Sequence, residues 1–112
     1  MRKLLVAVLI AAVSAVLATQ AFAATRNVNV GDDYFLRKGK APTVTVSKGT
    51  RVTWKWVGKD LHNLAVTRGP VKFRSSYKED GTFSRKLRRT GTYKIVCTIH
   101  QPDMRMTLKV VR

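Results

Sequence analysis

Alternation of apolar and polar residues runs through most of the chain after residue 24 and constrains its fold more than any other feature. Val44 and Val46 alternate with threonines, and Val52, Trp54 and Trp56 alternate with polar residues. A period of two is typical of β-strands with one buried face. No stretch after residue 24 carries a helical period. The sequence therefore predicts an all-β domain whose strands turn their apolar faces to a shared core.

The predicted strands are short, and glycine-containing turns such as Lys48-Gly49 and Thr90-Gly91 separate them. Regular turns between alternating strands favour an antiparallel β-sandwich or a small barrel. Arg85 falls on the apolar face of its strand, which suggests a position at a sheet edge. The strands expected on this basis cover residues 26–30, 34–35, 43–47, 51–57, 64–67, 82–87, 93–97 and 104–110, and segment 71–77 is ambiguous.

The first 23 residues are predicted to be a cleavable signal peptide. Arg2 and Lys3 are followed by an almost wholly apolar run from Leu4 to Leu17, and Ala21-Phe22-Ala23 has the small-x-small pattern of a cleavage site. The apolar run is shorter than the roughly 20 residues of a spanning helix. A retained membrane anchor is the alternative. We therefore expect an exported protein, periplasmic or extracellular, with one domain over residues 24–112.

Composition limits what this domain can be. The 112 residues have a net charge of +16, and without Arg2 and Lys3 the chain keeps 20 basic and 6 acidic residues, a net charge of +14. A hydrophobic content of 45% supports a packed core and excludes a disordered basic tail. The single cysteine excludes an intramolecular disulfide. Small domains often need a disulfide or a bound metal ion for stability. Because a disulfide is excluded, a metal ion is the remaining candidate for this stabilising role.

The residues with distinctive chemistry are Cys97, His100 and Met104, together with His62 about 35 residues upstream. Cys97 ends an apolar strand face, His100 follows three residues later, and Met104 four residues after that. A short loop can turn these three side chains toward one point, and a sandwich can bring the loop of His62 to the same end. One thiolate, two imidazoles and a weak axial thioether form the ligand set of blue copper sites.

Each of these residues also has an ordinary structural interpretation. Cys97 alone is typical of a small buried hydrophobe, and Met104 alone is typical of a core residue. An unpaired cysteine in an exported protein is open to oxidation unless something protects it, and metal ligation would do so. Zinc can also bind one cysteine and two histidines with a water molecule. The methionine in the fourth position favours copper.

On these residues the chain resembles the small blue copper proteins, the cupredoxins of the plastocyanin, pseudoazurin and amicyanin type. The resemblance covers nearly all of residues 26–111. It implies a two-sheet Greek-key β-sandwich, a copper ion near one end, and an exposed edge of His100 that passes the electron. It also implies that Asn63 forms a hydrogen bond that holds the ligand loops together. The segments that carry it are 31–35, 44–54, 62–64, 91–93 and 97–104.

The ligand loop departs from this family pattern at two points. Three residues separate His100 from Met104, whereas relatives commonly have two or four. Asp103 stands beside the predicted axial ligand, where relatives often have glycine. A carboxylate turned toward the metal lowers the reduction potential, but on an exposed loop we expect Asp103 to point into water.

The leading functional prediction is an exported one-electron carrier that cycles between Cu(I) and Cu(II). A copper-binding protein of the cell envelope that delivers or buffers copper is the alternative, and an exclusively cationic binding module is a further one. An enzyme is disfavoured, because a second copper centre needs more than two histidines. The positive charge, densest at Arg85–Arg89, predicts an acidic redox partner. It also allows attraction to an anionic envelope surface. A monomer is expected, and export argues against nucleic acid.

Overall fold

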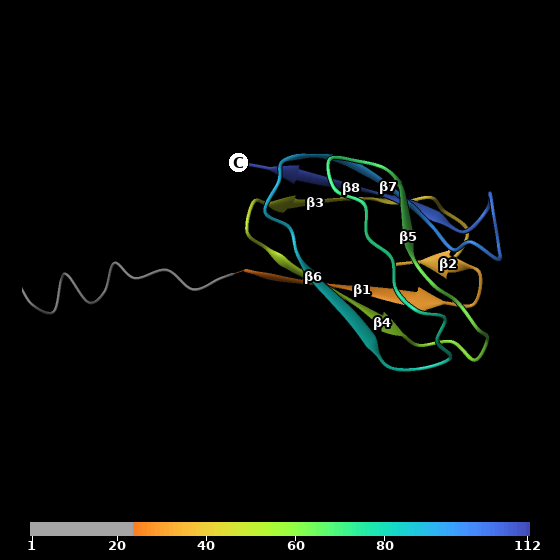
Figure 1. The fold of residues 1–112 in the computed structure, drawn as a ribbon. Helices are drawn as coiled ribbons and strands as arrows, with labels where there is room; N and C mark the ends of the chain where they lie inside the picture. Colours follow the sequence, from red (N-terminus) through yellow and green to blue (C-terminus); the bar gives the residue numbers. More distant parts are fainter. Residues whose placement is uncertain (1–23) are drawn as a thin grey trace, which may run out of the picture.

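The computed structural model describes residues 24–112, so the predicted signal peptide at 1–23 lies outside the described residues. Within this range the chain forms strands and turns (Figure 1), and none of it forms a helix that could cross a membrane. The strands are β1 (Thr25–Gly31), β2 (Tyr34–Phe35), β3 (Thr43–Ser47), β4 (Arg51–Trp56), β5 (Ala65–Arg68), β6 (Thr82–Lys86), β7 (Gly91–Val96) and β8 (Arg105–Val111).

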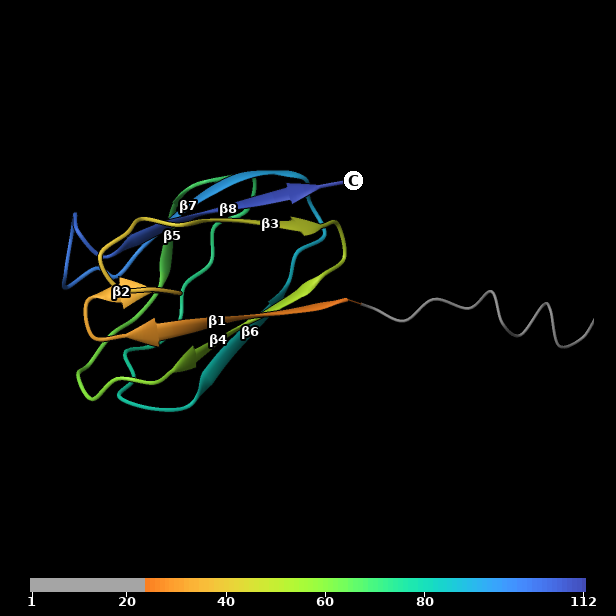
Figure 2. The ribbon, with the colours of Figure 1, turned by 180° about the vertical axis from the view of Figure 1, so that it is seen from behind.

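Two four-stranded sheets lie face to face, one in the order β2-β1-β4-β6 and the other in the order β3-β8-β7-β5 (Figures 1 and 2). The predicted two-sheet β-sandwich is confirmed. The expectation of purely antiparallel pairing was wrong, because β1 pairs with β4 and β3 pairs with β8 in parallel. A strand with one buried face alternates whichever way its neighbour runs. The sequence pattern therefore does not reveal strand direction.

The core lies between the sheets and is built from the residues that alternate inward. Trp54, Tyr93, Ile95 and Leu108 are fully buried, and their polar neighbours in sequence face water. The Trp54 indole donates a hydrogen bond to the Met106 Sδ across the core, at 3.5 Å. Burying a large apolar side chain is worth about 1.5–3 kcal/mol. This alternating set of side chains therefore holds the two sheets together.

Arg85 and the segment 71–77 were the two irregularities of the predicted strand pattern in the second half of the chain. Arg85 lies on β6, which is an edge strand, and its guanidinium stands 5.1 Å from the centre of the Phe73 ring. The predicted edge position is confirmed, and the cation rests on an aromatic face. The ambiguous segment 71–77 is not a regular strand. It lies beside β5, where Arg74 forms an isolated bridge with Ala65, and Lys78, the residue that follows the segment, forms another with His62.

The sandwich has two distinct ends, as Figure 1 shows. The segments 31–42, 57–63, 78–81 and 97–105 form what we call the site end. The opposite, distal end is formed by the start of β1, the β3–β4 turn, residues 86–90 and the C-terminus. Hydrogen bonds join these distal segments: Lys48 N donates to Val111 O, Gly49 N to Leu87 O, and Arg51 N to Ala24 O. β1 and β4 run from the distal end to the site end.

A matched pair of substitutions on β8 tests the buried face. Leu108→Ala is expected to destabilise the domain by about 2–5 kcal/mol, because Leu108 is fully buried and the change leaves a cavity. Val111→Ala, on the same strand but 45% exposed, is expected to cost less than about 0.5 kcal/mol. Urea denaturation of both variants measures the difference. Equal losses of unfolding free energy in the two variants would contradict the assignment of Leu108 to the buried face and Val111 to the exposed face of β8.

Candidate metal centre

Three side chains from two loops converge at the site end. The Nδ1 atom of His62 lies 3.2 Å from the Nδ1 atom of His100 and 3.9 Å from the Cys97 Sγ. The Cys97 Sγ lies 3.4 Å from the His100 Nδ1. His62 comes from the loop between β4 and β5, and the other two residues come from the loop between β7 and β8. The structure thus brings together three of the four predicted site residues, His62, Cys97 and His100.

These three donor atoms have the size and chemistry of a metal site. A point equidistant from them lies about 2 Å from each, which is close to the length of metal bonds to imidazole nitrogen and thiolate sulfur. His62 and Cys97 are fully buried. A soft thiolate together with two imidazoles suits copper in both of its oxidation states. The residues therefore fit a copper ion.

Hydrogen bonds hold the His62 ring from the side that faces away from Cys97 and His100. Its Nε2 donates to the Asp32 carboxylate at 3.0 Å, and Trp56 Nε1 donates to the His62 carbonyl oxygen at 3.1 Å. A carboxylate only accepts hydrogen bonds, so the Nε2 atom carries the imidazole proton. In the neutral imidazole the Nδ1 atom then keeps its lone pair, and this atom is turned toward Cys97 and His100. Partners of this kind set the tautomer and orientation of metal-binding histidines.

Asp32 is itself held by the loop that carries His62. Its carboxylate accepts the backbone N–H groups of Lys59 at 3.0 Å and of Asp60 at 2.9 Å. The hydrogen bond from Asp60, followed by those from His62 and Lys59, lowers the pKa of Asp32 to about 2, so this carboxylate is ionised at neutral pH. A Cβ atom at Gly58 would lie 2.2 Å from the Asp32 Oδ1, which is why the loop approaches so closely only with glycine there.

The second imidazole is held differently. The His100 Nε2 lies 3.3 Å from the Oδ1 of Asp33, and the His100 side chain is 33% exposed. Asp33 has a φ of 72° in the two-residue turn between β1 and β2, a left-handed conformation that aspartate tolerates better than most residues. Adjacent aspartates of one turn thus face the outer nitrogens of both histidines. The expected exposed edge of His100 is present.

Asn63 connects the two ligand loops. Its Oδ1 accepts from the Thr98 backbone N–H at 2.8 Å and from the Thr98 hydroxyl at 3.1 Å, and the residue is fully buried. Asn63 follows His62, and Thr98 follows Cys97, so these bonds fix the spacing between an imidazole and the thiolate. The loop-holding role that the family resemblance implied for Asn63 fits this geometry.

Met104 closes the ligand loop. Its backbone N–H donates to His100 O at 3.0 Å, its carbonyl accepts from Cys97 N at 3.0 Å, and its side chain is fully buried. These bonds hold Met104 beside the Cys97 backbone. Asp103 is exposed, as expected, so its carboxylate faces solvent.

Asp32 and Asp33 are the site residues that sequence reasoning missed. The sequence signals were their place in segment 31–35, which carries part of the family resemblance, and the adjacency of two acids in a chain with six acidic residues. Asp32 lies thirty positions before His62, and no local pattern relates the two positions. Their contact arises because the β1–β2 turn and the loop after β4 meet at one end of the same sheet.

Comparison with known proteins agrees with this geometry. The family of copper-binding proteins described as plastocyanin/azurin matches residues 26–111. Among solved structures, the chain is similar to a Cu(I) form of an amicyanin variant with a methionine-to-alanine change, at 26% identity and a TM-score of 0.64. It is also similar to a reduced amicyanin variant with a tryptophan-to-tyrosine change, at 24% identity and a TM-score of 0.65. Both matches cover 83% of this chain and 87% of the other.

No curated protein sequence matches the chain. The family match spans both sheets and every residue of the His62–Cys97–His100 cluster. The chain therefore belongs to the plastocyanin/azurin family of copper-binding proteins, and this cluster is the place for one copper ion.

Proposed function

We propose that this protein is an exported type 1 (blue) copper protein that carries single electrons between redox partners. The observation that carries the proposal is the buried triangle of His62 Nδ1, Cys97 Sγ and His100 Nδ1, with only His100 reaching the surface. Copper bound there supplies a one-electron Cu(I)/Cu(II) couple. One buried site with one exposed ligand suits a carrier, since it offers a short path for electrons and little room for a substrate.

The chain's own residues limit how far the site can rearrange. Asp32 holds the His62 ring from outside, and Asn63 ties the His62 loop to the Cys97 loop. Electron transfer is favoured when the ligands keep their positions in both oxidation states. We assign Met104 as the axial thioether ligand, supported by its full burial and its backbone hydrogen bonds to Cys97 and His100.

The surface around His100 suits a transient partner. Ile99, Leu61 and Tyr77 are 51%, 44% and 50% exposed. Ile99 precedes His100, Leu61 precedes His62, and the Tyr77 hydroxyl lies 2.7 Å from the Thr98 hydroxyl. Electron-transfer encounters use small interfaces, and exposed apolar side chains gathered at one site favour contact there. We infer that the partner docks on these residues and exchanges electrons through His100.

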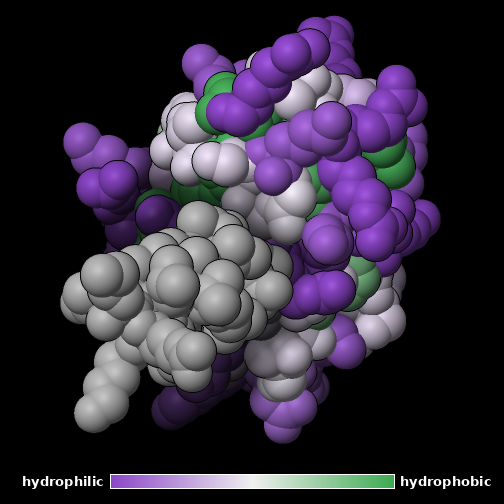
Figure 3. Space-filling model, turned by 90° about the vertical axis from the view of Figure 1, so that its left-hand side faces the viewer, coloured by the Kyte–Doolittle hydropathy of each residue, from purple (hydrophilic) through white to green (hydrophobic). Residues whose placement is uncertain are grey.

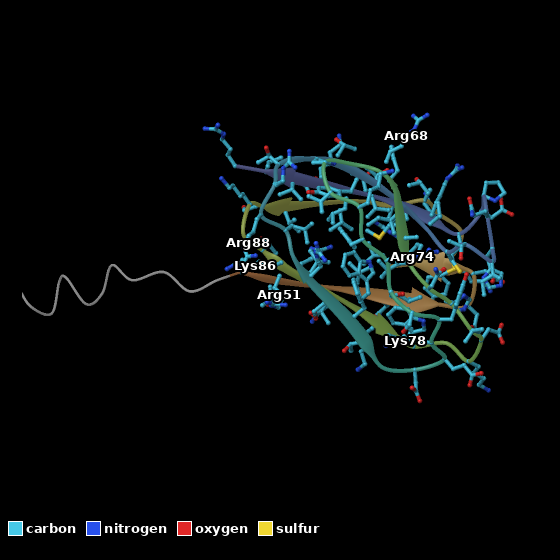
Figure 4. All side chains as sticks on the ribbon, in the orientation of Figure 1. Arg51, Arg68, Arg74, Lys78, Lys86 and Arg88 are labelled. Carbon is cyan, nitrogen blue, oxygen red and sulfur yellow. The ribbon has the colours of Figure 1, made fainter. Side chains whose placement is uncertain are left out.

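Other features of the proposal rest on the sequence. The predicted signal peptide supports export to the periplasm or the extracellular space, with a monomeric domain over residues 24–112. The acidic character of the redox partner stays a prediction from net charge. Figure 4 shows Lys86 and Arg88, from the Arg85–Arg89 run, far from the ligand loop, so this run does not border His100.

Copper delivery or buffering would use the same ligands as electron transfer. The electron self-exchange rate separates these functions, because a carrier must exchange electrons rapidly without releasing the metal. Fast self-exchange with retained copper supports the proposal. Slow exchange accompanied by copper transfer to a chelator would favour the copper-handling alternative.

Removal of the thiolate provides the sharpest test of the ligand set. Copper(II)-loaded protein is expected to be intensely blue, and Cys97→Ser is expected to abolish this absorption because the sulfur-to-copper charge transfer is lost. Visible and electron paramagnetic resonance spectra of both proteins measure the change. A blue band that survives in Cys97→Ser would show that the thiolate ligand is misassigned.

The axial assignment is tested by two buried methionines, Met104 at the end of the ligand loop and Met106 on β8. Met104→Leu is expected to keep the blue colour and raise the reduction potential, because a donor to Cu(II) is removed. Met106→Leu is the matched control, since Met106 is 2% exposed and bonded to Trp54 in the core. Spectroelectrochemical titration measures both potentials. Equal shifts of the reduction potential in the two variants would show that Met104 is not a copper ligand.

The support that Asp32 gives to His62 can be measured as copper affinity. Asp32→Asn is expected to weaken Cu(II) binding about tenfold or more, because a neutral amide orients and polarises the imidazole less than a carboxylate does. Asp60→Asn is the control, since only the Asp60 backbone N–H bonds to Asp32. Competition with a chelator gives both dissociation constants. Similar losses would mean that overall charge, not the contact with His62, sets the affinity.

A further inference from the structure

The acidic residues of the domain are confined to one end. All six lie in the site-end loops, at positions 32, 33, 60, 79, 80 and 103. Asp32 and Asp33 face the two histidines, Asp60 adjoins Asp32, and Asp103 lies in the ligand loop. Glu79 and Asp80 follow Lys78, which is bridged to His62. The same loops carry six basic residues, so the site end has no net charge.

The remaining basic residues lie on the strands, in segment 71–77 and at the distal end, where there is no acidic side chain to balance them. Figure 4 shows Arg51, Lys86 and Arg88 close together where the chain enters β1, and Figure 3 shows mostly hydrophilic residues among those coloured on this end. Lys48 belongs to the same end through its bond to Val111. All four side chains are exposed. We call Lys48, Arg51, Lys86 and Arg88 the distal cationic cluster.

Neither end neutralises the other. Within residues 24–112, the ion pairs between side chains involve only histidine with aspartate, so no lysine or arginine is paired with a carboxylate. The seven residues of β1 span about 23 Å, nearly three times the screening length of about 8 Å at physiological salt. An anionic surface at one end is therefore scarcely felt at the other. The net charge of the domain acts at the distal end and along the strands, away from copper.

The path of the chain indicates which anionic surface meets this end. β1 begins at the distal end, and only the seven residues 18–24 separate it from the apolar run that ends at Leu17. Seven residues reach at most about 25 Å. While that apolar run is in a membrane, as a signal peptide or as an anchor, the bilayer lies on the side of the distal cationic cluster. An acidic protein has no such connection to this end.

We propose that the distal cationic cluster docks the domain on an anionic phospholipid bilayer, with the copper end facing away from the membrane. Lysine and arginine near such a surface are attracted by its negative potential, and a cluster of them holds a protein there reversibly. His100 and the exposed Ile99 then remain accessible to a redox partner. The cluster contains no candidate copper ligand, so this proposal and the electron-carrier proposal can fail separately.

The experiment measures vesicle binding of the copper-loaded domain over residues 24–112, which contains both sheets. Sedimentation with phosphatidylcholine vesicles, with and without 30% phosphatidylglycerol, is carried out at about 0.02 M and about 0.15 M salt. Binding is expected only with phosphatidylglycerol and is expected to weaken with salt. Each basic residue near the surface is worth about fivefold in partitioning. Lys48→Gln, Arg51→Gln, Lys86→Gln and Arg88→Gln combined are expected to weaken binding by at least about thirtyfold.

The matched control removes the same charge from the site end, through Arg37→Gln, Lys38→Gln, Lys40→Gln and Lys59→Gln combined. This variant is expected to lose less than about threefold in partitioning, because its residues face away from the vesicle. Retention of the blue band shows that both variants are folded. Equal losses in the two variants, or no dependence on phosphatidylglycerol, would overturn the proposal.

Lysine labelling tests the orientation directly. With vesicles bound, Lys48 and Lys86 are expected to be protected from a water-soluble acylating reagent, while Lys40 and Lys59 react as in the free protein. Protection of Lys40 and Lys59 instead would overturn the orientation. Binding of soluble polyglutamate through the distal cluster without binding to vesicles would also overturn the proposal, since it would indicate an acidic protein as the partner.

Discussion

Burial of the two apolar sheet faces against each other is the constraint on which the rest of this structure depends. The fully buried Trp54, Tyr93, Ile95 and Leu108 fix the sheets in position, and this fixes where each strand ends. His62 enters from the loop leaving β4, and Cys97 and His100 enter from the loop leaving β7. Without the core, no local interaction would bring donors 35 residues apart within 3.9 Å of each other.

Polar contacts around the site fix the positions of the ligand side chains that the packed core brings close together. Asp32 and Asn63 both act on the His62 segment, one at the outer nitrogen of the imidazole and the other through Thr98 beside the thiolate. Both are side chains on loops, yet each accepts two or more hydrogen bonds, several of them from backbone N–H groups. Buried or partly buried acceptors satisfied in this way hold a rigid site, because moving one partner leaves another unpaired.

The net charge of +14 is not spread evenly over the domain, and the two ends of the sandwich use charge differently. Acidic side chains gather where they can orient imidazoles and balance the basic residues of the same loops. The distal end keeps its positive charge because it has no acidic side chain. Since the ends lie farther apart than the screening length at physiological salt, the surface proposed for the electron partner and the surface proposed for an anionic membrane can act independently.

The sequence alone predicted the all-β class, most strand positions, the edge position of Arg85 and the candidate ligands, because each depends on a local period or on residue chemistry. Only the tertiary structure decided the parallel pairing of β1 with β4, because alternation reports a buried face and not a neighbour's direction. It also decided the contact between Asp32 and His62 and the separation of Arg85–Arg89 from His100. These relations join residues distant in sequence, and the packing of two sheets creates them.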